Sequence, residues 1–512
     1  MFAQDSYPRI NIMATSHNEK DTVKKVLVLP IIALLFLTSC LHLESQAEST
    51  LEPIPPTLSL IGQFDFGSGL IPEYRSVLQD LSDASFYSIE FIIADDLYHV
   101  TGSETIHYTN TENVSLHEVQ LRLFPNILGG KMVMGHIKEN GNVVTPRYSL
   151  NNSLLVIPLE RSIEPKESIT LSMDFDITVP QSVDLNYGVL AYADNVLALA
   201  HAYPMIAVYD EEGWNAEIPP QTGDVTYADM SFFVVTVDAP KKATLAGSGR
   251  EVSRQDNGGR QTVRYEAGPV RDFYLAASPD YEVFTRAVNG VTLRFYTRDY
   301  LQAGAEFALD VAARSLEIFG ERYAPYPYTE LDFVSTPTHA LGIEYPGMIA
   351  ITHSILEPDN NYLEATIAHE TAHQWFYNLV GNDQLDDPWL DESLAQFATL
   401  QYFTDEYGSA GEDGFRSTLA GRWSRIGNEN IPVGLPVQDY SGAEYSGIIY
   451  GRGALFFESL REQMGREAFE SFIKSYVQNN AWNIGTTEIL KTAAEAQCGC
   501  DLSDLFKDWI YP

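Results

Sequence analysis

The chain has 512 residues, of which 45% are hydrophobic, and its formal net charge at pH 7 is −38. Hydrophobic content on this scale can bury more than one core, so two domains are the natural expectation. The excess of acid argues against a nucleic-acid-binding protein, because attraction to phosphate requires the opposite charge. It also opposes adsorption to anionic lipid headgroups, so attachment to a membrane would need a covalent lipid.

The N-terminal 40 residues have the pattern of a secretory signal. Two lysines precede an apolar run at residues 26–37, and Leu-Thr-Ser leads into Cys40, which resembles a bacterial lipobox. An uncleaved membrane anchor is the alternative, but the run is shorter than the ~20 residues that span a bilayer. We expect residues 1–40 to be a lipoprotein-type signal peptide. Lipidation at Cys40 would then anchor the exported protein at the periplasmic or extracellular face of a bacterial cell envelope.

Two regions follow that differ in hydrophobic period. Residues 41–84 begin with a proline-containing polar stretch, and we predict a tether or linker there. Over residues 85–286 apolar and polar residues alternate, as in Val119, Leu121 and Leu123, and Asn-Gly turns interrupt the runs. A period of two is typical of strands buried on one face, so we predict an N-terminal antiparallel β domain.

From residue 287 the pattern becomes mainly helical. A strand is predicted near residues 291–296, followed by an amphipathic helix from Tyr300 to Phe319 that Gly320 stops. Further helices are predicted around residues 451–464, 467–479, 487–497 and 502–510. Residues 287–512 are therefore expected to form a second, mainly α-helical domain.

The most informative feature is the sequence HETAH at residues 369–373, followed by Glu392. His369 and His373 are four residues apart and share one face of a helix, so both can bind one metal ion. The eighteen residues between His373 and Glu392 can end that helix and return a carboxylate from a second one. Three protein ligands leave a fourth position for water, as in catalytic zinc sites. Glu370 can then act as the general base, and we predict one zinc ion per chain.

The residues that flank H-E-x-x-H help to decide whether this short motif occurs here by chance. H-E-x-x-H occurs by chance in on the order of one per cent of chains of this length. Here Gly381 is predicted to cap the end of the first helix, and Asp387 with Pro388 to begin the second. A purely structural zinc site is disfavoured, because such sites are usually closed by cysteines and none lies nearby.

Four segments in order resemble the membrane alanyl aminopeptidase family of zinc metallopeptidases, which are gluzincins. They are HETAHQWF at 369–376, WLDESLA at 389–395, GIEYPG at 342–347, similar to Gly-x-Met-Glu-Asn, and YGRGA at 450–454, similar to Tyr-x-Lys-Gly-Ala. The resemblance implies that residues 287–512 form a thermolysin-like (α+β) catalytic domain of a multidomain aminopeptidase acting on peptides or proteins.

The resemblance also implies roles for residues outside the zinc motif. Gly342 and Glu344 would belong to the substrate-binding strand, with Glu344 holding the free α-amine, and Tyr450 would stabilise the oxyanion. The chain departs from the family at Tyr345, and we find no match to the family's glutamine-bearing motif in the N-terminal domain. A zinc endopeptidase or non-peptide hydrolase therefore stays open, as does a surface-binding lipoprotein that retains a metal site.

Three smaller features have two interpretations each. Glu344 precedes an apolar run and fits an edge strand beside a cleft, although a solvated loop acid fits equally well. Asp391 is a candidate to orient the imidazoles, or an exposed acid at a helix start. Cys498 and Cys500, separated by one glycine, could form a disulfide or remain free thiols.

Overall fold

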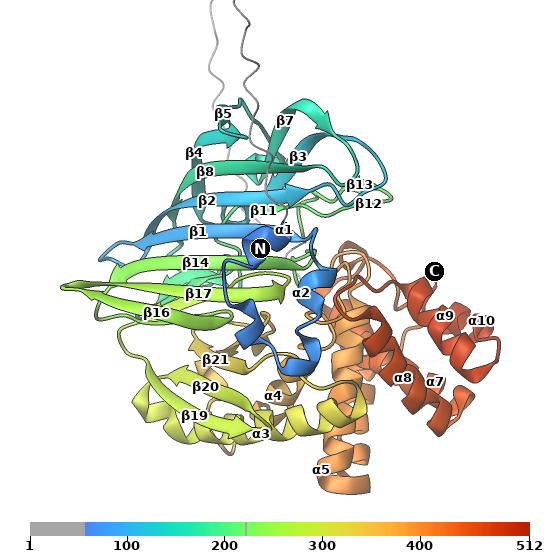
Figure 1. Ribbon diagram of the computed structural model, residues 1–512. Helices are drawn as coiled ribbons and strands as arrows, with labels where there is room; N and C mark the ends of the chain where they lie inside the picture. The colour runs from blue at the N-terminus through green and yellow to red at the C-terminus, as the bar shows by residue number, and fades with distance from the viewer. Residues whose placement is uncertain (1–56, 221–222, 512) are drawn as a thin grey trace, which may run out of the picture. The chain divides into compact units, whose positions relative to one another are not determined.

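The computed structural model describes residues 57–220 and 223–511 (Figure 1). The predicted signal peptide, Cys40 and most of the predicted linker lie outside these residues. Within the described parts of the chain, no helix is both long and apolar enough to cross a membrane.

The last part of the predicted linker is folded, contrary to expectation. It contains the short helices α1 (Thr57–Ile61) and α2 (Val77–Asp80), and it buries Phe66. The Phe66 ring meets that of Phe232 edge to face, with centroids 5.1 Å apart. The segment thus covers an apolar patch of the neighbouring sheet, and its leucine, isoleucine and phenylalanine residues distinguish it from the polar stretch that precedes it.

The N-terminal part of the described chain consists of β-sheets (Figure 1). The largest has eight strands, in spatial order β16 (Arg250–Asn257), β17 (Arg260–Val270), β14 (Ser231–Pro240), β1 (Ser85–Ile93), β2 (His99–Thr109), β8 (Ser168–Thr178), β4 (Lys131–Glu139) and β5 (Asn142–Val143). Its neighbours are antiparallel except β1 and β14, which run parallel. The predicted β domain is therefore present with one parallel pair.

Smaller sheets complete this β region. They are β15 (Thr244–Gly247), β18 (Leu275–Ser278), β10 (Val196–Leu199) and β9 (Leu190–Ala193) in one sheet; β11 (Met205–Ile206), β3 (Leu116–Arg122), β7 (Leu154–Ile163) and β6 (Arg147–Ser149) in another; and the hairpin β12 (Tyr209–Asp210) and β13 (Gly213–Trp214). Strand β3 buries Val119 and Leu121 completely, as the alternating pattern predicted.

A five-stranded mixed sheet opens the second region, in the order β19 (Glu282–Val288), β20 (Val291–Thr297), β21 (Glu330–Thr336), β23 (Met348–Thr352) and β22 (Gly342–Ile343). Helix α3 (Gln302–Arg322) connects the parallel strands β20 and β21. The helix continues through Gly320, which was predicted to stop it, and ends two residues later.

The remaining chain is helical. The helices are α4 (Leu363–Ala372), α5 (Trp389–Ser424), α6 (Gly442–Gly447), a π-helical turn (Ile448–Arg452), α7 (Gly453–Met464), α8 (Arg466–Asn480), α9 (Thr487–Cys498) and α10 (Ser503–Trp509). Helix α7 packs on α5, α8 on α7 and α9 on α8 (Figure 1). Cys498 and Cys500 are joined by a disulfide bond.

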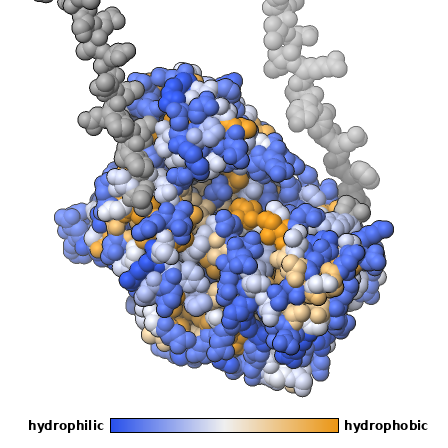
Figure 2. Space-filling model, turned by 45° about the vertical axis from the view of Figure 1, so that its right-hand side comes forward, coloured by the Kyte–Doolittle hydropathy of each residue, from blue (hydrophilic) through white to orange (hydrophobic). Residues whose placement is uncertain are grey.

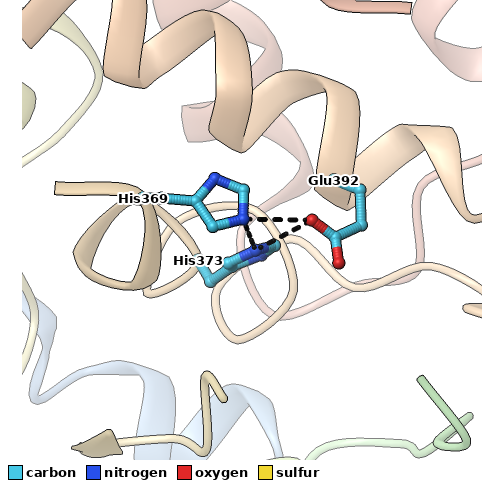
Figure 3. A group of neighbouring side chains, drawn as sticks. All are labelled: His369, His373 and Glu392. Carbon is cyan, nitrogen blue, oxygen red and sulfur yellow. Dashed lines mark hydrogen bonds and ion pairs between the residues drawn. The ribbon is translucent and has the colours of Figure 1, made fainter. Parts of the chain in front are cut away.

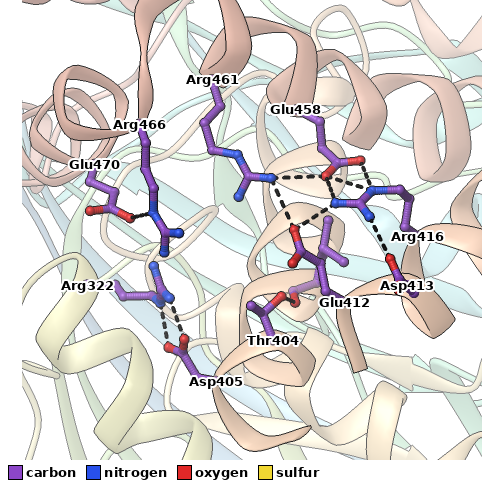
Figure 4. Close-up of polar contacts among 11 residues, drawn as sticks. Arg322, Thr404, Asp405, Glu412, Asp413, Arg416, Glu458, Arg461, Arg466 and Glu470 are labelled. Carbon is purple, nitrogen blue, oxygen red and sulfur yellow. Dashed lines mark hydrogen bonds and ion pairs between the residues drawn. The ribbon is translucent and has the colours of Figure 1, made fainter. Parts of the chain in front are cut away.

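Helix α5 consists of two halves that are held differently. Gly408 has φ 65° and ψ −149°, so the helix breaks there. The first half is buried over residues 391–402, whereas the second half is mostly exposed. In the second half Arg416 pairs with Glu412 at 2.7 Å and with Glu458 of α7 at 2.8 Å (Figure 4). These ion pairs supplement the packing of the second half-helix, in which Leu419 is fully buried and Phe415 and Trp423 pack against the core.

A buried arginine connects the β region to the chain that follows α4. Arg271, at the end of β17, donates to the carbonyl oxygens of Tyr377 at 2.7 Å, Ala228 at 2.9 Å and Asn483 at 2.8 Å. A Cβ at Gly381 would overlap the guanidinium, so glycine is required there. The contact fixes the segment that leaves the second histidine of the HETAH sequence.

Candidate metal centre and active site

The two histidines of the HETAH sequence lie together at the end of α4. The helix ends at Ala372, and His373 still has helical torsion angles (φ −62°, ψ −14°). Their Nε2 atoms are therefore 3.2 Å apart. The prediction that Gly381 caps this helix is wrong, because the chain turns away directly after His373 and Gly381 packs against Arg271.

The structure brings Glu392 to the same point from the first turn of α5 (Figure 3). Its Oε2 lies 3.1 Å from Nε2 of His369 and 3.5 Å from Nε2 of His373. Asp387 does not cap α5 as predicted. Its carboxylate instead accepts a hydrogen bond from Thr487 Oγ1 at 3.0 Å, which ties the start of α5 to α9.

These three residues fit a tetrahedral metal ion. A zinc ion about 2.0–2.1 Å from each ligand would separate the ligand atoms by about 3.3 Å. The observed separations of 3.1, 3.2 and 3.5 Å match that value. His373 Nδ1 also lies 2.9 Å from the carbonyl oxygen of Phe376, to which it can donate, leaving the Nε2 lone pair for a metal.

Glu370 lies beside this cluster. It forms a second group of neighbouring ligand atoms with Glu344 and His373, and it is 5% exposed. Burial first, and then the charge of Glu344, raise the pKa of Glu370 well above its ordinary value. Gly342 makes this position possible, because a Cβ there would overlap the Glu370 side chain. The absence of a side chain at Gly342 therefore leaves room for Glu370, and the predicted substrate-binding role of Gly342 stays a prediction.

Glu344 follows β22, which is an edge strand of the five-stranded sheet, and it is 6% exposed. The alternative of a solvated loop acid is therefore wrong. Gln384 Nε2 donates to Glu344 Oε1 at 3.0 Å and to Asp391 Oδ2 at 2.8 Å. Because one amide nitrogen serves two carboxylates, the orientation of the Gln384 amide is fixed and its Oε1 faces away from both.

Asp391 neither orients an imidazole nor lies exposed at the helix start, the two interpretations offered by the sequence. It is 1% exposed, so it is not a solvated acid, and it accepts hydrogen bonds from Gln384 and from the backbone N–H of Glu392 rather than from an imidazole. Gln384 was not predicted from the sequence. Glutamine has no charge or metal-ligand signature, and the available signal was only its position between His373 and Glu392.

Tyr450 lies on the other side of the cluster, on the π-helical turn. Its hydroxyl donates to Glu392 Oε1, and its ring centroid is 6.0 Å from that of His369. The β region contributes Asp224, which shares a hydrogen bond with Glu392. Burial, followed by the charges of Glu344 and Glu392, raises the pKa of Asp224 well above its ordinary value. Asp224 was also missed, because no motif surrounds it.

The site is shielded from solvent, since His369, Glu370, His373 and Glu392 are all less than 10% exposed. Figure 2 shows one face of the molecule hollowed across its middle, with hydrophobic side chains gathered in the hollow. Shielding of this kind strengthens charge–charge interactions with anything that binds the cluster.

Comparison with known proteins agrees with this arrangement. Residues 307–509 match the Peptidase family M1 domain. Aminopeptidase M1-B of Oryza sativa subsp. japonica is 28% identical over 296 residues, which are 54% of this chain and 34% of the relative. Aminopeptidase N of Lactococcus lactis subsp. lactis is 26% identical over 234 residues, or 42% of this chain and 27% of the relative. The chain thus spans about a third of the length of these curated relatives.

Solved structures show the same fold. An M1 zinc metallopeptidase from Deinococcus radiodurans superposes with a TM-score of 0.66 at 21% identity, covering 84% of this chain and 94% of that one. A variant of that enzyme bound to a Tyr-Ser-Ala substrate gives a TM-score of 0.65 at 22% identity, with the same coverage. The expected β domain followed by a mainly helical domain is therefore confirmed.

Proposed function

We propose that this chain, whose residues 307–509 form a peptidase family M1 domain, is a zinc metallopeptidase that releases N-terminal residues from peptides. One observation carries the proposal. The possible metal ligands His369, His373 and Glu392 converge within 3.5 Å, and Glu370 and Glu344 adjoin them. The relatives named aminopeptidases support the same activity.

One zinc ion per chain would be held by His369, His373 and Glu392. When bound, zinc supplies a Lewis acid that polarises a carbonyl group and lowers the pKa of water. Glutamate and histidine ligands suit this ion, and the spacing of the ligand atoms fits it.

The side chains around the metal would do the remaining work. Glu370 takes a proton from the attacking water and passes it to the leaving amine. Tyr450 donates a hydrogen bond to the oxyanion that develops from the scissile carbonyl. The buried carboxylate of Glu344 pairs with the substrate's α-ammonium, which places the first peptide bond at the metal.

Hydrolysis of a peptide library tests the proposal. Each peptide is offered to the zinc-loaded protein with a free and with an acetylated N-terminus, and products are identified by mass spectrometry. We expect loss of the first residue from free peptides only. Glu370→Gln should retain zinc and lower kcat by about 10²–10⁴-fold, the usual contribution of a general acid–base group.

Other results would identify the alternatives. Internal cleavage of free and acetylated peptides alike would indicate an endopeptidase and remove the proposed role of Glu344. Zinc binding without turnover of any peptide would contradict the peptidase and favour a non-peptide hydrolase or a binding protein.

We also propose, from the N-terminal sequence alone, that Cys40 carries a lipid and anchors the protein to the cell envelope. In a bacterial host, the full-length chain should incorporate labelled palmitate and partition into detergent. Cys40→Ser should abolish both. Incorporation that persists in this variant would contradict a lipid at Cys40.

A further inference from the structure

Arg422, in the second half of α5, is a cation beside the candidate catalytic tyrosine. Its guanidinium carbon lies 5.5 Å from the centroid of the Tyr450 ring, and its Nη1 donates to Ser446 Oγ at 3.2 Å. A guanidinium has five N–H donors. Ser446 is the one hydrogen-bond acceptor that its side chain contacts within the described residues, so most of these donors remain available.

Arg422 also has no carboxylate partner in the described part of the chain. Arg416, on the same half-helix, contacts three carboxylates, those of Glu412, Asp413 and Glu458. The chain has 70 acidic and 32 basic residues, so carboxylates are abundant. Among the described residues, Arg271 also lacks a carboxylate partner, but its guanidinium donates to several carbonyl oxygens, whereas Arg422 donates only to Ser446. The remaining donors of Arg422 therefore suit an anionic ligand.

The position of Arg422 indicates where that anion would lie. Glu344 and Glu370 are grouped with His373, on one side of the metal ligands. Arg422 faces Tyr450, which contacts His369 and Glu392. The Glu344 carboxylate, proposed to bind the substrate's ammonium group, and the Arg422 cation, which could bind an anionic group of the same substrate, thus both lie near one metal centre.

We propose that Arg422 binds the C-terminal carboxylate of short peptides, so that dipeptides and tripeptides with a free C-terminus are the preferred substrates. This rests on the proposed aminopeptidase function. The ring centroids of His369 and Tyr450 are 6.0 Å apart, and the guanidinium carbon of Arg422 is 5.5 Å from the Tyr450 centroid, so this carbon lies no more than 11.5 Å from the His369 ring centroid. Each extended residue spans about 3.3–3.6 Å, so a carboxylate one or two residues past the cleaved bond reaches this guanidinium.

The chemistry of arginine suits this role. Its planar fork binds a carboxylate through two parallel hydrogen bonds, and it keeps its charge when partly buried. The ion-paired network around Arg416 holds this half of α5 against α7, so the guanidinium is positioned before a substrate arrives (Figure 4). Recognition at both ends would restrict the enzyme to peptides whose length matches the spacing of the two charges.

The test compares tripeptides that differ only at the C-terminus, as free acid or amide, together with an aminoacyl p-nitroanilide that has no carboxylate. We expect the unmodified protein to favour the acid by about 10- to 100-fold in kcat/KM, the range for a charged hydrogen bond. Arg422→Met should remove this preference by raising KM for the acid much more than KM for the amide or the anilide.

Two further variants separate contact from general charge. Arg422→Lys keeps the charge but lacks the fork, so it should restore part of the preference. Arg425→Met removes an equal charge from an exposed residue less than one turn away and should keep the full preference.

Equal hydrolysis of acid and amide by the unmodified protein would overturn the proposal, and this ratio is measurable even if a variant fails to fold. Loss of activity on all three substrates in Arg422→Met would also overturn it, since that pattern indicates support of Tyr450 alone. Failure of the aminopeptidase itself looks different, because the unmodified protein would then cleave none of the three.

Discussion

The two sides of the metal cluster are built in contrasting ways. On the acidic side, which comprises Gly342, Glu344, Glu370, Gln384 and Asp391, four side chains are almost fully buried and Gln384 bridges two carboxylates. On the basic side, which comprises Tyr450 and Arg422, the side chains are only partly buried. Most of the N–H donors of Arg422 have no acceptor among the described residues.

This difference indicates that the two sides have different tasks in substrate binding. The acidic side is rigid and shaped for one small charged group, as expected where the first residue of a peptide must be placed accurately. The basic side can accept groups that vary between substrates. Mutations on the acidic side should therefore alter which peptide end is recognised, whereas those on the basic side should alter rate or the response to peptide length.

The largest effect should come from the centre that both sides share. His373→Ala removes one of three ligands. We expect zinc affinity to fall by more than about 10²-fold, because even indirect partners of zinc ligands contribute 10–100-fold. Metal analysis after dialysis and activity at limiting zinc measure this. His136→Ala, at an exposed residue of the β region, is the control and should keep full zinc content.

Tyr450→Phe tests the basic side. We expect kcat to fall by about 10²-fold with little change in KM, because the lost hydrogen bond would act mainly in the transition state. Steady-state kinetics on a free tripeptide measure both constants. A similar kcat in the variant would show that Tyr450 does no more than orient Glu392.

Gln384→Leu tests the acidic side. Glu344 and Asp391 would lose their shared donor, so KM for free peptides should rise by about 10-fold while kcat changes less. Burial raises the pKa of Glu344 above its ordinary value, and the hydrogen bond from Gln384 opposes this rise, so its removal should raise that pKa further. As pH is lowered, the increase in KM should then begin at a higher pH than in the unmodified protein. An unshifted pH profile would contradict the role given to Gln384.

Gly342→Ala should have the smallest effect on binding but a measurable one on stability. The new methyl group would overlap Glu370, and overpacking of this kind typically costs about 1–3 kcal/mol. Urea unfolding monitors the change. Gly135→Ala is the matched control, because a Cβ there meets no atom within 4 Å and the free energy of unfolding should hardly change.

Local patterns predicted most of the architecture. The period-two runs correctly indicated the β region, and the last four predicted helices agree closely with α7 to α10. Spacing along the chain also sufficed to propose His369, His373 and Glu392 as neighbours. Each of these inferences depends on residues that are close in sequence or on a motif whose geometry is regular.

The errors arose where tertiary contacts decide the local structure. Gly320 does not stop α3, and Gly381 is required by Arg271 rather than by a helix end. Asp224 reaches the centre through packing between distant segments, Gln384 lies on the connection between the metal ligands, and neither has a motif. Arg422 was not predicted either, because its proximity to Tyr450 depends on the break at Gly408 and on the packing of the second half of α5 against the π-helical turn.

The most direct test of the central claim is the ratio of kcat/KM for one peptide with a free and with an acetylated N-terminus, measured for the unmodified protein and for Glu344→Gln. Because a buried charge pair typically contributes about 2–5 kcal/mol, we predict a ratio of about 10² or more that falls toward one in the variant. A ratio near one in the unmodified protein, with internal cleavage of the acetylated peptide, would contradict an aminopeptidase anchored by Glu344.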